Sequence, residues 1–432
     1  MRRNIEVTRY PKITMRFAIP LILATSALAA PPSSPDDDLL SLANEEYLLD
    51  ANGWRGHFAE ETGITFIANY AVDVLGNPVG GLNNKLRYST LGLFGANVQL
   101  GTLTNEDWLA AWSFQATGYN AEGKNLANDI GNAIQPSTLF SGVVPVGLSE
   151  VYLSGQWDNV LARLGRITPE DYFAASPLWD YFVSLAYNDN PWNLNTNNPN
   201  FSGSPSTLWM AGADWQIDSE WKISIAAANT SRPDLTAPSK RGVDFHFDPL
   251  DGTMFLAEIC YHWRVDFGQP QALSGSAQVG GYHDTAQFTR ITKPPAGVSP
   301  TKPGLSAAWV ILEQQLIAGE SVDDIGLTTW LLASWGGPKS IANSPWFFST
   351  GFVYEGLLPS RPDDALAFGY SINWFNNQLT GQNHETDIEL TYLIQLTPWL
   401  SIQPDLQVIL DPNGMNSIND ALVLGFQCAV DF

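Results

Sequence analysis

The sequence has 432 residues and a formal net charge of −23, and only 15% of its residues are charged. Such an acid excess argues against nucleic-acid binding and against an anion-selective pore. Its two cysteines, Cys260 and Cys428, fall on opposite faces of their predicted strands, which argues against a disulfide bond. No spacing of cysteine and histidine residues resembles a metal site, so the sequence predicts no metal and no cofactor.

The N-terminal residues have the pattern of a secretory signal followed by a linker. Residues 16–30 hold one basic residue and a short apolar run that ends in Ala-Leu-Ala, and Met15 is a second candidate start. No later stretch approaches the ~20 consecutive apolar residues of a transmembrane helix. We expect a signal peptide over residues 1–30, a linker and short periplasmic segment over 31–56, and one exported domain over 57–432.

From residue 64 onward, apolar and polar residues alternate with the period of two that β-strands have. In segment 365–375, for example, Leu366, Phe368 and Tyr370 share one face. Sixteen such segments are predicted, over 64–73, 86–100, 108–116, 148–156, 160–167, 209–217, 221–227, 253–263, 274–284, 307–317, 326–335, 346–357, 365–375, 387–396, 400–411 and 421–432. The last one stays in phase up to Phe432, as expected of a strand that closes a membrane barrel by pairing with the first.

The connections between these segments alternate in length. Residues 157–159, 218–220 and 397–399 are tight turns, whereas the connections over 118–147, 168–206, 231–252 and 285–306 are long. Four tryptophans stand where an interfacial aromatic girdle would lie, namely Trp157, Trp221, Trp263 and Trp399. The pattern predicts an all-β fold, a transmembrane antiparallel β-barrel of about 16 strands in the bacterial outer membrane, with short periplasmic turns and long extracellular loops.

Segment 385–413 carries the most specific sequence pattern. Residues 397–400 read Thr-Pro-Trp-Leu, residues 403–407 read Gln-Pro-Asp-Leu-Gln, and Pro412-Asn413 follow. By this pattern the chain resembles the carbohydrate-selective porins of the OprB type, over about residues 54–432. It departs from the family at residues 50–55, where the family often has Gly-Asp-Trp-Gly-Gly before an arginine. The resemblance implies a sixteen-stranded outer-membrane channel for the diffusion of sugars, without catalysis.

Strand alternation places several polar side chains on the lumen side of the barrel. Sugars are bound by planar hydrogen-bonding groups and aromatic faces, so Glu258, Glu389 and Gln407 are candidate pore residues. The competing explanation is that these side chains merely hold water in an aqueous lumen. Asp387 and Glu389 also have a spacing compatible with a glycosidase pair, but any acidic barrel produces it, and we predict no enzyme. Arg163 faces the lumen as well, and it would govern a constriction that prefers anions.

The long segment 168–206, hereafter the 168–206 loop, contains eight aromatic residues and four acids but no lysine or arginine. A disordered loop would not carry so many aromatics. Two explanations remain open: an ordered outer cap, or a loop folded into the barrel that narrows the pore. In the second case the residues offered to a saccharide would be Trp179, Tyr181, Trp192, Asp180 and Asp189.

The sequence thus predicts an outer-membrane porin for the passive, saccharide-selective diffusion of small sugars into the periplasm. Its expected partners are small saccharides and outer-membrane lipid. Two alternatives remain, a general or cation-preferring porin of the same fold and a surface binding protein whose barrel is only an anchor. The oligomeric state, a monomer or a homo-oligomer such as a trimer, is also left open.

Overall fold

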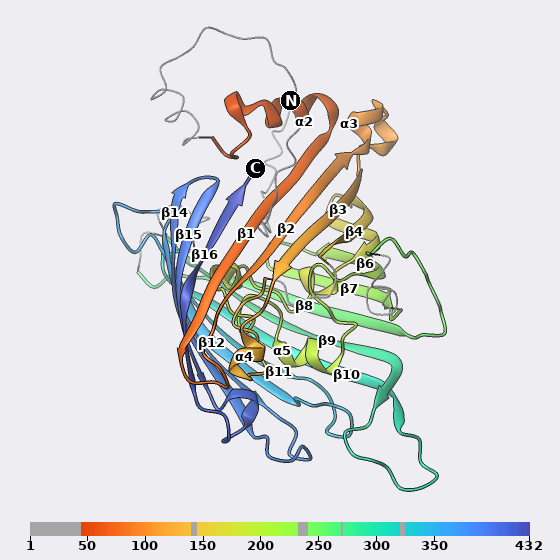
Figure 1. Ribbon diagram of the computed structural model, residues 1–432. Coiled ribbons are helices and arrows are strands. Elements are labelled where there is room, and N and C mark those ends of the chain that lie inside the picture. Colours follow the sequence, from red (N-terminus) through yellow and green to blue (C-terminus); the bar gives the residue numbers. More distant parts are fainter. Residues whose placement is uncertain (1–44, 140–144, 232–240, 269–270, 320–324) are drawn as a thin grey trace.

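A computed structural model describes residues 45–139, 145–231, 241–268, 271–319 and 325–432; the expected signal peptide lies outside these residues. Sixteen antiparallel strands close into one barrel in which each strand pairs with its neighbours in sequence and β1 pairs with β16 (Figure 1). The strands are β1 (Ile64–Val79), β2 (Leu86–Gln99), β3 (Trp112–Gly123), β4 (Val146–Trp157), β5 (Val160–Ile167), β6 (Leu208–Gln216), β7 (Trp221–Asn229), β8 (Thr253–Val265), β9 (Leu273–Thr289), β10 (Thr301–Ile317), β11 (Leu327–Trp335), β12 (Trp346–Glu355), β13 (Ala365–Trp374), β14 (His384–Thr397), β15 (Leu400–Leu410) and β16 (Ala421–Asp431). The predicted fold class and the order of the strands are therefore confirmed.

Short helices lie at the ends of the strands and in the loops. They are η1 (Ala51–Gly53), α2 (Trp54–Thr62), α3 (Leu100–Thr104), η2 (Asp107–Leu109), α4 (Ala127–Ile130), η3 (Pro169–Asp171), η4 (Pro177–Tyr181), α5 (Trp192–Asn197) and η6 (Pro412–Gly414). Among the described residues, no helix has the length and apolar character needed to cross a membrane.

The boundaries of the first, third, ninth and tenth strands differ most from the prediction, and β1 and β3 run on to Val79 and Gly123. The third strand begins at Trp112 and not near Trp108, because Trp108 lies in the single turn η2 and is 72% exposed. The long connection expected over 285–306 shortens to 290–300, because β9 and β10 continue to pair up to Thr289 and Thr301. The residues added to β10, 301–306, do not alternate between apolar and polar side chains, so the sequence pattern does not reveal the longer pairing.

The barrel closes through its first and last strands. Their register runs from Asn69 opposite Asp431 to Val79 opposite Leu422, and the Phe432 N–H donates to the Ala68 carbonyl at 2.8 Å. The Arg55 guanidinium of α2 donates to the carbonyls of Phe432 and Phe66. The segment before β1 is thereby bonded to the seam, and α2 lies at the barrel end where β16 finishes (Figure 1).

The outer wall is apolar and has aromatic side chains at the short-turn end. Leu164, Ile225 and Val279 each expose more than half of their surface outward. Trp157 contacts Trp112 with ring centroids 5.0 Å apart, and Trp221 contacts Tyr261 at 4.5 Å. These pairs form part of the predicted aromatic girdle. Cys260 is buried on the lumen face, Cys428 lies on the outward face, and both are free thiols, as predicted.

Candidate functional site

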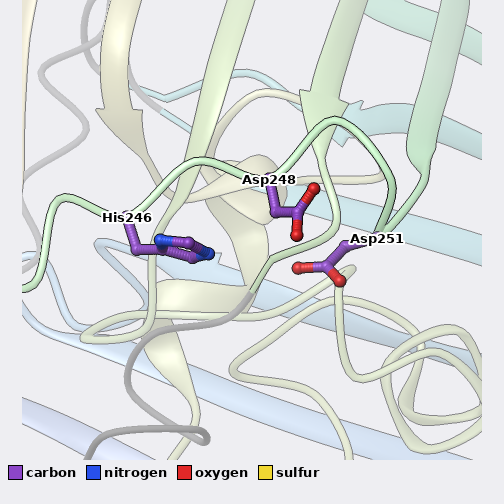
Figure 2. Close-up of side chains that lie close together, drawn as sticks. All are labelled: His246, Asp248 and Asp251. Atoms are coloured by element: carbon purple, nitrogen blue, oxygen red, sulfur yellow. The ribbon is translucent and has the colours of Figure 1, made fainter.

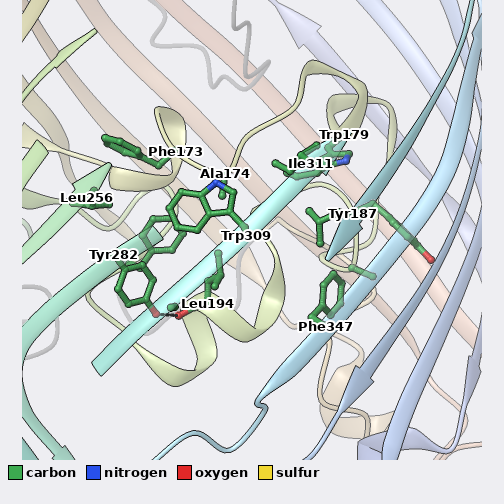
Figure 3. Close-up of a cluster of buried hydrophobic side chains, with 14 of the residues drawn as sticks. Phe173, Ala174, Trp179, Tyr187, Leu194, Leu256, Tyr282, Trp309, Ile311 and Phe347 are labelled. Carbon is green, nitrogen blue, oxygen red and sulfur yellow. Dashed lines mark hydrogen bonds between the residues drawn. The ribbon is translucent and has the colours of Figure 1, made fainter. Parts of the chain in front are cut away.

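The 168–206 loop folds into the barrel. Phe173, Phe182 and Phe201 belong to this loop, yet each is at most 2% exposed. Their partners are inward-facing side chains of the wall: Phe182 meets Trp330 of β11, and Phe201 meets Tyr282 of β9, each with centroids 5.3 Å apart. Figure 3 shows the loop side chains against Tyr282, Trp309 and Phe347 of the strands. The loop is therefore not an outer cap, and it fills the part of the lumen along β8–β13.

Lumen-facing carboxylates bind the backbone of this loop. Glu258 of β8 accepts the Ala174 N–H at 3.0 Å, and Glu389 of β14 accepts the N–H groups of Val183 at 2.7 Å and Ser184 at 3.2 Å. Two more wall acids accept from the loop: Glu150 accepts the Thr168 N–H, and Asp284 accepts the side-chain amides of Asn198 and Asn200. In the other direction, the Gln403 amide donates to the Tyr181 carbonyl, and the Tyr282 hydroxyl donates to the Leu194 carbonyl. Each of these wall side chains holds groups of the loop by hydrogen bonds inside the barrel, so these side chains act as fasteners for the loop.

The connection between β3 and β4 is fastened in the same way. Glu385 accepts the N–H groups of Ala133, at 2.8 Å, and Ile134, at 2.7 Å. The Gln407 amide donates to the Pro136 carbonyl at 2.8 Å. Ile130 and Ile134 of this connection are fully buried. Two loops thus fold inward and bond to the strand wall at β14 and β15.

The predicted wall residues Glu258, Glu389 and Gln407 face the lumen as expected, and they are at most 6% exposed. They bind loops rather than line open water. Their role in binding loops could not be predicted from the sequence. Strand alternation indicates which side of the sheet a side chain faces, but not which residue it contacts.

The predicted loop residues differ in accessibility. The Trp179 ring is 4% exposed and packs in the cluster between loop and wall (Figure 3). Trp192 is half-buried, with its ring 6.3 Å from that of Phe375. The Tyr181 hydroxyl donates to Glu355 at 3.2 Å, and Asp180 is exposed. Trp179 therefore presents no open ring face in this conformation, whereas Tyr181, Trp192 and Asp180 each keep exposed area.

Asp189 belongs to a group of acids around η3. Burial raises the pKa of Glu170 well above its ordinary range, and the neighbouring carboxylate of Asp189 raises it further. Burial also raises the pKa of Asp189, which shares a hydrogen bond with Glu170, and the pKa of Asp171. Protonation of this group relieves repulsion between acids that the fold holds close together.

Arg163 of β5 lies beside the start of the loop, and its side chain is 12% exposed. Its Nη1 atom is 2.8 Å from an oxygen of Asp214 on β6, and its guanidinium lies 4.0 Å from the centre of the Tyr172 ring. Other lumen-facing polar side chains that keep exposed area lie on β2, β3, β7 and β8: Asn97, Gln115, Lys222 and His262. The sequence pointed to Arg163, but it did not single out Tyr172, Asp214 or Lys222.

A separate group lies on the connection between β7 and β8, where His246, Asp248 and Asp251 each place one ligand atom within 4.8 Å of the others (Figure 2). One imidazole and two carboxylates suit a divalent cation. A turn accounts for part of this arrangement, because the Leu250 N–H donates to Asp248 at 2.8 Å. The sequence analysis did not foresee the group, and exposed acids of this kind by themselves define no site.

A closed sixteen-stranded barrel with an inward-folded loop after β5 is the architecture of a porin, an outer-membrane channel. The chain belongs to the OprB family of carbohydrate-selective porins, whose family model matches residues 83–432. It is 23% identical over 459 residues to Porin B of Pseudomonas aeruginosa, covering 95% of each chain. It is 22% identical over 457 residues to the putative porin QuiX of Acinetobacter baylyi, covering 97% of this chain and all of the relative.

Solved structures show the same fold. The high-pH structure of Pseudomonas putida OprB aligns with a TM-score of 0.80 at 20% identity, over 90% of this chain and 99% of that chain. The low-pH structure of the same protein aligns with a TM-score of 0.57. The predicted family is confirmed, and with it the function of a porin for sugars in the bacterial outer membrane.

Proposed function

We propose that small neutral saccharides diffuse through this barrel along the polar wall of β3–β8, past the exposed side of the 168–206 loop. The arrangement of the loop carries the proposal. Its fasteners on β9, β14 and β15 hold most of the loop against the wall opposite β3–β7, while Glu150 of β4 and Glu258 of β8 hold its first residues, and polar side chains on β2, β3, β7 and β8 keep exposed area. Two inward-folded loops narrow the lumen, so a solute meets these groups as it passes.

The groups in this passage suit a neutral, hydroxyl-rich solute. The Tyr172 ring offers an aromatic edge, and Arg163, Asp214 and Gln115 offer planar donors and acceptors. Arg163 and Asp214 form an ion pair, so they present hydrogen-bonding groups with little net charge. A channel must bind its solute weakly enough to release it, and such contacts are modest individually. Tyr181, Trp192 and Asp180 are further candidates, and Trp179 would require a movement of the loop.

We also propose that no catalysis accompanies passage. A glycosidase needs one carboxyl group to exchange a proton with the glycosidic oxygen and a second to attack or activate water. Both Glu389 oxygens accept backbone N–H groups, and Glu258 accepts bonds from Ala174 and Trp309. These contacts support a structural role for the two carboxylates.

Planar-bilayer recordings with a panel of neutral saccharides test the proposal. We expect neutral saccharides to block the ionic current. Shortening the 168–206 loop should raise the single-channel conductance. Tyr172→Ala and Trp192→Ala should weaken the block, whereas Tyr88→Ala, which removes an exposed aromatic side chain from the outer wall, should not.

The outcomes separate the alternatives. A current that neutral sugars do not affect, but that depends strongly on the cation, would indicate a general or cation-preferring porin. Absence of conductance would indicate a surface binding protein anchored by its barrel. Unchanged conductance and sugar block after loop shortening would place the pathway elsewhere in the lumen.

A further inference from the structure

The outer wall has a crevice of about 570 Å³ at the end of β11–β13 where the long loops lie. Its strand residues include Phe348 and Trp374, which face outward by alternation with the buried Phe347 and Asn373, and Phe347 also contributes to its lining. The register places Trp346 directly opposite both Trp335 and Trp374. The crevice therefore opens on the lipid side of the barrel, at the level of an aromatic row.

The crevice has an apolar interior and a polar rim. Trp346 is 51% exposed and Trp374 is 38% exposed, although the barrel buries most other tryptophans more deeply. At the rim lie Lys339, from the β11–β12 loop, and Asn377 and Asn383, from the β13–β14 loop, all three of them exposed. The described lining contains one cation and no acid, in a chain with 44 acidic and 21 basic residues.

The floor of the crevice is fixed from inside the barrel. Phe375 lines the crevice, is 9% exposed and packs against Trp192 of the inward-folded loop, with centroids 6.3 Å apart. The Asn376 amide donates to the carbonyls of Lys339 and Ala342 at 2.7 Å each, which ties the two rim loops together. A ligand would therefore meet a preformed site.

We propose that this crevice binds a phosphorylated glycolipid of the outer leaflet. The Lys339 ammonium would bind the phosphate as a compact point charge. The amides of Asn377 and Asn383 would bond to sugar hydroxyls, while the rings of Trp346 and Trp374 lie against the sugar and the first acyl carbons, at the depth that tryptophan prefers in membranes. The crevice continues the lipid-facing wall, which favours a lipid over a soluble ligand. Its one cation, Lys339, stands on a protein with an excess of acids, which favours a lipid that carries a negative charge.

The test uses the full barrel, purified in a neutral detergent and titrated with a diphosphorylated, acylated glucosamine disaccharide under native mass spectrometry. A second titration uses the same glycolipid after removal of its phosphates. We expect Lys339→Ala to weaken binding of the phosphorylated form about fivefold, as loss of one exposed ion pair would. Trp346→Ala should weaken binding of both forms.

Lys293→Ala is the matched control, because Lys293 is exposed on the neighbouring β9–β10 loop and does not line the crevice. It should leave binding unchanged, and heat-modifiable migration on gels verifies that each variant forms a closed barrel. Equal binding to the wild type and Lys339→Ala, or equal binding of the two glycolipid forms to the wild type, would overturn the proposal. Displacement of the glycolipid by free saccharide would make the crevice a sugar site, and a dimer that occludes Lys339 would make it an interface between copies; either result also overturns it.

Discussion

Replacing Glu389 with alanine tests the idea that wall carboxylates hold the 168–206 loop inside the barrel. Glu389 is 1% exposed and accepts two N–H groups of the loop, from Val183 at 2.7 Å and Ser184 at 3.2 Å. The substitution removes both acceptors and leaves two buried donors unpaired. The β14 backbone ladder does not depend on this side chain, so the barrel itself should stay closed.

The expected magnitude follows from the two hydrogen bonds. A buried N–H group left without an acceptor costs about 1–3 kcal/mol, and the N–H group with the longer bond belongs at the low end. Water that enters from the lumen would bind to these N–H groups in part, so the net free-energy cost of the substitution for the folded loop is about 2–4 kcal/mol. At ~1.4 kcal/mol per factor of ten, local release of the loop at Val183 and Ser184 should become about 30- to 1000-fold more frequent. The fasteners at Glu258 and Gln403 remain, so release should be local.

Single-channel recordings and limited proteolysis measure this release. We expect Glu389→Ala to increase open-channel noise and cleavage within the loop, with unchanged heat-modifiable migration of the barrel. Glu389→Gln should give an intermediate effect, because it keeps one acceptor oxygen. Glu122→Ala removes a glutamate side chain from an exposed position on β3 and serves as the control. Wild-type noise and protease resistance in Glu389→Ala would refute the fastening role.

Four further predictions concern the ends of the chain, its charge and its titration. Deleting Phe432 removes the last aromatic ring and the backbone N–H bond to Ala68, and replacing it with a charged residue removes the ring alone. Both changes should impair insertion, and normal yield of folded protein would contradict this. With 44 acids against 21 bases, the open channel should prefer cations, less so at high salt, and a reversal potential that shows anion preference would point to control by Arg163. Because the pKa values of Glu170 and Asp189 are raised, their protonated forms stabilise the folded loop at low pH, and this contribution is lost as pH rises through the raised pKa values. Channel noise should therefore grow toward alkaline pH. Asp189→Asn should weaken this pH dependence of the noise. Protein from outer membranes should begin just after Ala29 or Ala30, and N-terminal sequencing that found Met1 or Met15 would contradict the expected export signal.

Much of the wall could be predicted from sequence because its information is local. In β13, Leu366, Phe368 and Tyr370 alternate with small or polar residues, and this period alone fixes which side chains face lipid. The same rule failed at Trp108. It stands four residues before Trp112, which fits one face of a strand, but Trp108 lies in the helical turn η2. Alternation also placed Glu258 and Glu389 in the lumen correctly.

The contents of the lumen could not be predicted in this way. Glu389 meets Val183 and Ser184 across more than 200 residues of sequence, and Glu385 meets Ala133 and Ile134 across about 250. No spacing rule links positions so far apart. Aromatic content showed that the 168–206 loop is ordered, but the depth of Trp179 depends on wall residues from strands β8–β13 that come later in the chain.

The distance in sequence between the inward-folded loop and its fasteners sets an order of folding. The 168–206 loop is made before β8, β14 and β15, yet its backbone bonds reach Glu258, Glu389 and Gln403 on those strands. Contacts between distant segments form late, because the entropy of closing the intervening chain must first be overcome. The bonds to Glu389 and Gln403 can therefore form only after β14 and β15 have joined the barrel. We infer that the barrel closes before this loop is fully fastened, and that narrowing of the channel is the last step of its maturation.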